Sequence, residues 1–223
     1  MRLVQGDFDR SREYGADPVA QAREWERQGA RAIHVVDLDG AKEGYPAQTG
    51  IVREIVRAVG VPVQVGGGVR SVAALEDLLS AGAARVVMGT AAVLDRELRR
   101  LAVEVAGESL IVAVDARGGV VSTHGWQSAS GVRVLELARE LSEDGVAAVL
   151  YTDVERDGMG GGAALESTAE VAGVIPTVAS GGVGRVEDVS ELRRLEGVTG
   201  VVVGTALYER RVELTELLEA ARP

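Results

Sequence analysis

The chain repeats itself at a spacing of about half its length, and this repeat constrains the fold more than any other feature. Three blocks recur in the same order at offsets of 114 to 116 residues: Gly29–Asp37 resembles Gly145–Asp153, Val61–Val69 resembles Ile175–Val183, and Val86–Ala91 resembles Val201–Ala206. Three blocks in register at a near-constant offset indicate two copies of one structural unit. The sequence therefore predicts two similar halves.

Short apolar runs alternate with longer amphipathic segments along the chain. The predicted strands are Ala32–Asp37, Pro62–Gly66, Arg85–Met88, Leu110–Asp115, Ala147–Thr152, Pro176–Ser180 and Thr199–Val203. The predicted helices are Pro18–Gln28, Thr49–Val59, Val72–Ser80, Arg96–Val105, Val132–Glu143, Leu165–Ala172, Val186–Arg194 and Val212–Ala221. Apolar strands alternating with helices indicate a parallel sheet buried on both faces. With the repeat, they predict an α/β fold, a (βα)8 TIM barrel built from two half-barrels, as one domain over residues 1–223.

The repeat also exposes a deficit at its beginning. The second half opens with the strand Leu110–Asp115, which ends in a carboxylate. Subtracting the offset places its counterpart at or before the first residue of the chain. We therefore expect the first barrel strand to be missing from this chain.

Composition limits the classes of function. The chain has no cysteine, 46% hydrophobic residues and a net charge of −10, which excludes a disulfide-stapled module and disfavours nucleic acid and anionic membranes as partners. Backbone amides can still bind a small phosphorylated ligand. The sequence has no apolar run of about 20 residues and no signal-peptide pattern, so we expect a cytoplasmic protein. Two histidines without ligand spacing predict no metal site. The glycine-rich stretches do not form a dinucleotide-binding fingerprint, so no such cofactor is predicted.

Glycines cluster where predicted strands end, and barrel active sites lie at the carboxyl ends of strands. One half carries Gly67, Gly68, Gly89 and Thr90, and the other carries Ser180, Gly181, Gly182, Gly204 and Thr205. Glycine lets backbone N–H groups approach an anion closely, although tight turns explain any single pair equally well. Two equivalent sets favour a ligand that carries a phosphate at each end.

Carboxylates and one indole complete the candidate site. Asp37, Asp39, Asp115, Asp153 and Asp157 lie at or just beyond strand ends, where a carboxylate can exchange protons with substrate or simply cap a loop. Asp157 ranks first as proton donor because its loop is glycine-rich. Trp126 follows the predicted strand Leu110–Asp115 and is placed either to stack on a flat heterocycle or to anchor its loop.

These residues stand in a longer pattern that resembles the ProFAR isomerase family of histidine biosynthesis. The matching segments are Arg2–Asp7, Val35–Ala41, Val63–Arg70, Gly89–Ala92, Tyr151–Gly158, Ala179–Val183 and Val203–Tyr208. The resemblance covers the whole chain. It implies a (βα)8 barrel that converts a phosphoribosyl aminoaldose to the aminoketose, an Amadori rearrangement without cofactor or metal.

The resemblance also implies roles for individual residues. Asp157 matches the general acid that helps open the ribose ring, and Asp115 and Thr152 match polar positions beside the reacting sugar. Arg2 matches a substrate-binding arginine, and Trp126 matches a tryptophan that stacks on substrate. One phosphate site matches Gly67, Gly68, Gly89 and Thr90; the other matches Ser180, Gly181, Gly182, Gly204 and Thr205.

Two departures from the family pattern matter. Family members begin with a strand that carries an aspartate, the general base, and this chain lacks both. His124 stands where a loop arginine is expected, which weakens the interpretation as a bifunctional enzyme that also isomerises phosphoribosylanthranilate. A start assigned at an internal codon, a truncation, and a strand donated by a partner chain each explain the deficit. We expect a monomer when complete, and poor activity with association through open barrel edges in this chain.

Two other interpretations remain open. The cyclase subunit of imidazole glycerol phosphate synthase shares the half-barrel repeat and both phosphate sites, but the residues at Thr152–Gly158 and Gly125–Trp126 favour the isomerase. A non-catalytic phosphosugar-binding barrel is the alternative from another class, because the general base is absent. Binding and turnover of the bisphosphate substrate separate these hypotheses.

Overall fold

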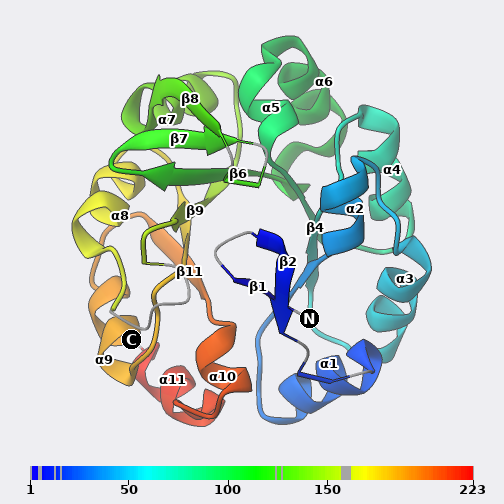
Figure 1. Cartoon of the computed structure of the whole chain (residues 1–223), viewed down its shortest axis with the longest axis vertical. Helices are drawn as coiled ribbons and strands as arrows, with labels where there is room; N and C mark the ends of the chain where they lie inside the picture. The colour runs from blue at the N-terminus through cyan, green and yellow to red at the C-terminus, as the bar shows by residue number, and fades with distance from the viewer. Residues whose placement is uncertain are drawn as a thin grey trace. The chain divides into compact units, whose positions relative to one another are not determined.

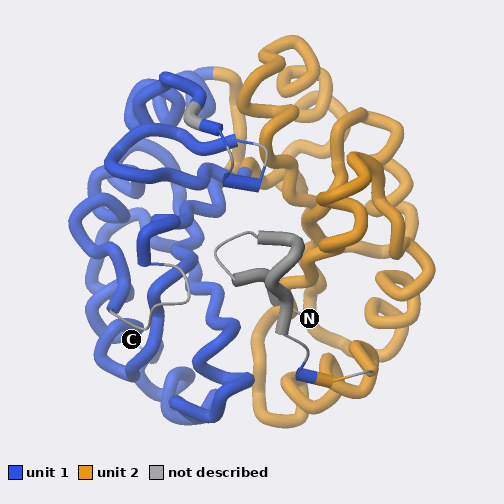
Figure 2. The backbone as a smooth tube through the Cα atoms, in the orientation of Figure 1, with its two compact units in different colours: residues 1–14, 113–143, 148–223 blue, residues 15–112, 144–147 orange. Residues whose placement is uncertain are grey.

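The computed structural model describes residues 2–4, 7–12, 14–15, 17–123, 125–126, 128–156 and 162–222. For residues 2–4, 7–12 and 129 only the backbone is described. The chain divides into two compact units, one comprising residues 15–112 with 144–147 (unit 2), the other 1–14, 113–143 and 148–223 (unit 1) (Figure 2). The division falls close to the start of the second sequence repeat.

Unit 2 alternates strands and helices along the chain (Figure 1). Its strands are β3 (Ile33–Val36), β4 (Val63–Gly66), β5 (Arg85–Met88) and the first part of β6 (Leu110–Arg117). Its helices are α1 (Pro18–Arg27), α2 (Leu38–Glu43), α3 (Thr49–Ala58), α4 (Val72–Ser80), α5 (Thr90–Leu94), α6 (Arg96–Ala106) and the 3-10 turn η1 (Gly107–Ser109).

Unit 1 continues from β6 with the same alternation. Its other strands are β1 (Arg2–Val4), β2 (Asp7–Arg12), β7 (Val120–Thr123), β8 (Ser128–Arg133), β9 (Ala148–Asp153), β10 (Thr177–Ser180) and β11 (Val198–Val202). Its helices are α7 (Val134–Glu143), α8 (Leu165–Ala172), α9 (Val186–Leu192), α10 (Thr205–Tyr208) and α11 (Leu214–Ala220).

The sheet confirms the predicted fold class. Its strands follow the order β11-β10-β9-β6-β5-β4-β3, which is the reverse of chain order without a switch point. A doubly wound sheet reverses direction at a switch point, whereas a (βα)8 barrel adds each strand beside the last. β1 and β2 form a separate antiparallel pair. The expectation that a first barrel strand is missing from this chain stays a prediction.

The repeat seen in the sequence is reproduced in the strand register of each unit. In unit 2, Ile33 pairs with Val63; at the equivalent position of unit 1, Val149 pairs with Thr177. Likewise Gly66 pairs with Val87, and Ser180 pairs with Val202. The repeated blocks therefore form the same local structure in both halves.

All seven predicted strands and eight predicted helices are present in the described chain, with small shifts at their ends. Several segments that were expected to be loops carry further elements, among them β1, β2, α2, α5, α10 and the β7–β8 hairpin. The hairpin sequences are rich in serine and glycine, so they lack the apolar run by which the other strands were predicted. Among the described residues, no helix is both long and apolar enough to cross a membrane.

Candidate active site

In unit 2, two glycine turns lie at the same edge of the sheet. Gly67 and Gly68 follow β4, while Gly89 and Thr90 follow β5 and begin the short helix α5. β4 and β5 are parallel neighbours, with Gly66 opposite Val87. The structure therefore brings together the four residues that were predicted to form one phosphate site.

Unit 1 contains the matching arrangement. Ser180 ends β10 and is followed by Gly181 and Gly182, while Gly204 and Thr205 follow β11 and begin α10. Because Ser180 pairs with Val202 in a parallel register, the two turns again share one edge of the sheet.

The glycine turns have the same backbone conformation in both units. Gly67 and Gly68 have φ values of 110° and 72°, and Gly181 and Gly182 have values of 84° and 75°. Such positive φ values favour glycine. A Cβ atom on Gly68 would lie 2.5 Å from the carbonyl oxygen of Gly40, so close packing alone requires glycine there.

Gly204 differs from these packed glycines. A Cβ atom at this position would meet no atom within 4 Å, so neighbouring atoms of the described chain do not exclude a side chain. Tight packing, the alternative that was weighed for these glycines, therefore explains Gly68 but does not explain Gly204. Open space beside a glycine is what the approach of an anion to the backbone requires.

Three predicted polar residues form a row across unit 1. Thr152 on β9 pairs with Ser180 on β10. The Val154 amide donates to the Ala116 carbonyl at 2.9 Å, and this parallel register places Asp115 of β6 opposite Thr152. Register partners share one face of a sheet. Asp115, Thr152 and Ser180 therefore occupy neighbouring positions on one face, at the carboxyl ends of three strands.

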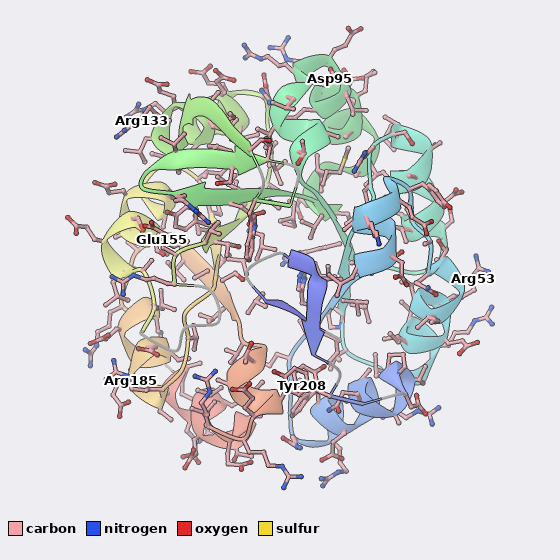
Figure 3. All side chains as sticks on the ribbon, viewed as in Figure 1. Arg53, Asp95, Arg133, Glu155, Arg185 and Tyr208 are labelled. Atoms are coloured by element: carbon pink, nitrogen blue, oxygen red, sulfur yellow. The ribbon has the colours of Figure 1, made fainter. Side chains whose placement is uncertain are left out.

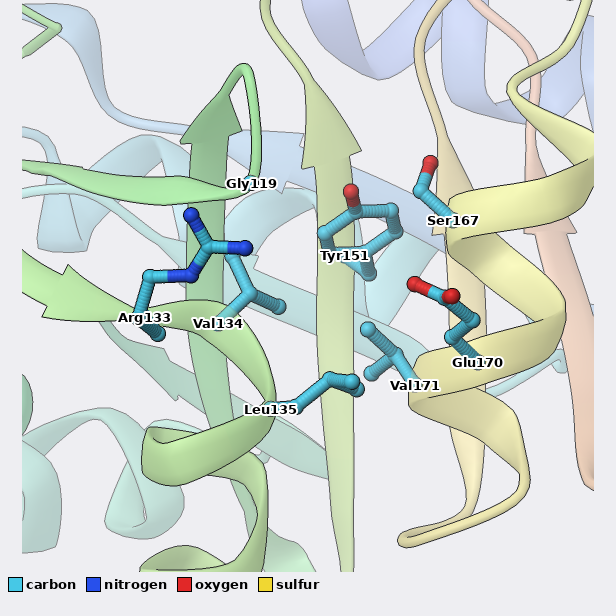
Figure 4. Close-up of a pocket in the computed structure, with 8 residues that line it drawn as sticks. All are labelled: Gly119, Arg133, Val134, Leu135, Tyr151, Ser167, Glu170 and Val171. Carbon is cyan, nitrogen blue, oxygen red and sulfur yellow. The ribbon is translucent and has the colours of Figure 1, made fainter.

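The opposite face of β9 is marked by a small pocket of about 70 Å³ between the strand and helices α7 and α8 (Figure 4). Tyr151 points into this pocket, with Ser167 and Glu170 of α8 on one side and Arg133 on the other. Burial raises the pKa of the Tyr151 phenol. Because side chains alternate along a strand, Thr152 points away from helices α7 and α8. The Asp115–Thr152–Ser180 row therefore lies on the face of the sheet opposite these helices.

Other strand-end carboxylates serve the local structure. Asp37 is buried and accepts hydrogen bonds from the amides of Gly40, Ala47 and Gln48 at 2.7–2.8 Å. Asp153 accepts from the Glu155 amide at 3.1 Å. The capping interpretation, which was weighed for each carboxylate, thus describes the contacts of these two side chains.

A buried carboxylate that the sequence analysis missed lies next to the second glycine turn. Asp188 of α9 is 1% exposed, and it accepts hydrogen bonds from the amides of Gly184 and Arg185 at 2.8 and 2.9 Å. The only sequence signal is an acidic residue three positions after Arg185, the residue that precedes α9. Arg185 is not a typical capping residue, so this spacing is a weak signal in the sequence.

Several predicted site residues fall outside the description. Asp157 and His124 lie outside the described residues, and for Arg2 only the backbone, within β1, is described. Trp126 is half-buried in the turn between β7 and β8, with a positive φ of 73° that is unusual for a bulky residue. Its predicted role on substrate is not tested by this geometry.

The histidine on β3 is structural. His34 Nδ1 lies 2.9 Å from Gln64 Nε2 of the neighbouring strand, as expected for a packed, hydrogen-bonded histidine. Burial lowers the pKa of His34 to about 4. Within the described part of the chain, no cluster of three metal-ligating side chains occurs.

Comparison with known proteins gives a consistent result over the whole chain. The profile of a family described as "Histidine biosynthesis protein" matches residues 1–213. A protein of Rubrobacter xylanophilus is 63% identical over 221 residues, covering 99% of this chain and 91% of its own length. Proteins of Sphingopyxis alaskensis and Synechococcus sp. (strain CC9902) are 46% and 45% identical, each over 99% of this chain and over 92% and 88% of their own lengths.

All three relatives carry one name, 1-(5-phosphoribosyl)-5-((5-phosphoribosylamino)methylideneamino) imidazole-4-carboxamide isomerase, the ProFAR isomerase. Identity of this level over nearly the full chain agrees with the matching profile. The chain belongs to the histidine biosynthesis protein family.

Proposed function

We propose that this chain is a ProFAR isomerase, which catalyses the Amadori rearrangement of the phosphoribosyl aminoaldose to the aminoketose in histidine biosynthesis. The observation that carries the proposal is the row Asp115–Thr152–Ser180, which joins polar side chains to the glycine turn of unit 1. The relatives named for this reaction support it. Its location in the cytoplasm remains a prediction.

The reaction moves hydrogen within one molecule, so it needs acid and base groups rather than an external oxidant. Protonation of the ribose ring oxygen opens the ring and leaves a protonated imine at C1. Removal of the C2 proton then gives an enaminol, which becomes the aminoketose when C1 gains a proton and the C2 hydroxyl loses one. We assign the first proton transfer to Asp157, and we assign Asp115 and Thr152 to binding the sugar hydroxyls beside C1 and C2.

The glycine turns are assigned to the two phosphates. Gly67, Gly68, Gly89 and Thr90 would bind one phosphate, and Ser180, Gly181, Gly182, Gly204 and Thr205 would bind the other. Backbone N–H groups suit a chain with a net charge of −10, because they attract a phosphate without adding positive side chains. Trp126 and Arg2 are assigned to contacts with the remainder of the substrate.

Among the described residues we assign none as the general base. A positioned base contributes about 10²–10⁴-fold to a proton transfer, so we predict that the turnover of this chain is low. Steady-state turnover of ProFAR tests this prediction, and turnover equal to that of a relative would refute it.

The non-catalytic alternative is separated by one experiment. The protein is titrated with ProFAR, binding is followed by calorimetry and conversion by absorbance. Binding with slow conversion supports the isomerase, while binding without conversion supports a phosphosugar-binding protein. Parallel conversion of phosphoribosylanthranilate would establish the bifunctional alternative, which the histidine at position 124 argues against.

A further inference from the structure

The loop between β10 and α9 is fixed by hydrogen bonds to one buried side chain, that of Asp188. Asp188 accepts hydrogen bonds from the backbone amides of Gly184 and Arg185 through the same oxygen, Oδ2. Its other oxygen, Oδ1, accepts from the Arg185 guanidinium at 3.3 Å. The Arg185 side chain is 64% exposed and lies at the beginning of α9 (Figure 3). Three donors thus offset the cost of burying this carboxylate.

The equivalent loop of unit 2 is fixed in a different way. At the repeat offset, Ser71 corresponds to Arg185 and Ala74 corresponds to Asp188. There the Ser71 hydroxyl accepts from the Ala74 amide at 3.2 Å, which is an ordinary helix cap. In unit 1 the hydrogen bonds run the other way along the chain. The Asp188 side chain, inside the helix, accepts from backbone amides at and before the beginning of the helix. The two halves share the glycine turn but differ in what supports it.

Asp188 also contacts the chain that follows β9. A Cβ atom on Gly162 would lie 3.4 Å from Asp188 Oδ1, while one on Gly182 would overlap the carbonyl oxygen of Gly162. Asp188, Gly162 and the glycine turn therefore pack as one cluster within unit 1.

We propose that Asp188 is a positioning residue, which holds the Ser180–Arg185 loop in the shape that binds one phosphate of the substrate. This inference rests on the proposed function for its ligand, and it adds a residue that does not itself touch the substrate. Its loss acts on the affinity for the phosphate, because Asp115, Thr152 and Asp157 are unchanged. The effect therefore belongs in KM rather than in kcat.

The test compares Asp188→Ala and Asp188→Asn with Asp95→Ala. Asp95 caps α6 by accepting from the Leu98 amide at 2.9 Å, so its removal also costs a helix cap, but far from the proposed phosphate loop in sequence. For Asp188→Ala we expect about a tenfold rise in KM with kcat within about twofold, the size of a lost charge-assisted hydrogen bond. Asp188→Asn should fall between this variant and the unchanged chain, and Asp95→Ala should leave KM unchanged.

Binding of inorganic phosphate, followed by ³¹P NMR, makes the test independent of turnover. If the unchanged chain does not isomerise ProFAR, the proposed function fails, while weaker phosphate binding in Asp188→Ala still supports the role of Asp188. Unchanged phosphate affinity, or equal losses in Asp188→Ala and Asp95→Ala, overturns the inference. If Asp188→Ala does not fold, faster hydrogen exchange at the Gly184 and Arg185 amides in Asp188→Asn supports the role, and unchanged exchange refutes it.

Discussion

Thr152 on β9 and Ser180 on β10 are register partners in a parallel pair, so a residue expected beside the reacting sugar and one expected at a phosphate lie in adjacent positions on one face. Thr152 is buried, at 6% exposure. The Thr152 hydroxyl lies in this row, where it is placed to bind a polar group of the substrate.

We therefore predict that Thr152→Val lowers kcat/KM about tenfold, the value of one hydrogen bond to a polar substrate, without unfolding the protein. Valine keeps the branched shape and the preference for a strand. Thr168→Val is the matched control, since Thr168 is also buried but lies on α8. Steady-state kinetics of both variants checks the prediction, and equal losses would contradict it.

The open space at Gly204 leads to a second prediction. Gly204→Ala adds a methyl group that meets no atom of the described chain, so its melting temperature should change little. If phosphate binds against this backbone, the same methyl group obstructs it, and KM should rise about tenfold or more. Gly50→Ala, on α3, adds a methyl group in equally open space. It should leave KM unchanged and stabilise the fold by about 0.5–1 kcal/mol, as expected for alanine in a helix.

A buried ion pair in unit 2 leads to a third prediction. Arg99 is 1% exposed and its guanidinium lies 2.6 Å from the Asp144 carboxylate, which is also buried. Hydrogen bonds from three arginines hold the pKa of Asp144 well below its ordinary value. The bond from Arg96 has the largest effect, and Arg99 and Arg100 add to it. Asp144→Ala leaves Arg99 buried without its carboxylate, and the free energy of unfolding should fall by about 3–5 kcal/mol.

The control for this pair is Glu24→Ala on α1. Glu24 pairs with Arg27 at 2.6 Å, but both side chains are exposed, so its removal should change the free energy of unfolding far less than Asp144→Ala does. Urea denaturation of the two variants measures both values. Similar losses would show that burial is not what makes the Asp144 cluster important.

His34 predicts how stability depends on pH. Burial holds the pKa of folded His34 at about 4, below its ordinary value of 6.5. Between these values the unfolded chain binds a proton that the folded chain does not. The free energy of unfolding is therefore unaffected by protonation of His34 above about pH 6.5. It falls as the pH drops towards 4, by up to about 3 kcal/mol, because protons bind preferentially to the unfolded chain.

Urea denaturation at pH 7, 6, 5 and 4.5 checks this dependence, with His34→Gln as the comparison. The glutamine variant retains a polar side chain opposite Gln64 but does not titrate. Its stability should fall less over this range than that of the unchanged chain. Parallel curves for the two proteins would assign the acid sensitivity to other groups.

The sequence by itself determined the repeat, and with it the alternation of strands and helices. Apolar runs such as Leu110–Asp115 are buried in any compact fold because their side chains leave water, and their alternation with helical segments indicates strands. The equivalence of the Gly67–Gly68 turn and the Gly181–Gly182 turn was also predictable, since similar sequences adopt similar turns. The β7–β8 hairpin was not predicted, because its short strands are stabilised by pairing, β7 with β6 and β8 with β7, rather than by a long apolar run.

Only the tertiary structure separated the roles of chemically similar residues. Asp37 and Asp115 both follow an apolar strand, yet Asp37 binds three backbone amides while Asp115 lies in the row with Thr152. The role of Asp188 depends on the turn into α9, which brings its carboxylate within hydrogen-bond distance of the Gly184 amide. Composition and spacing fix which residues are near in sequence, whereas hydrogen bonds between strands and across loops decide which polar groups meet, and these contacts form only when the chain is folded.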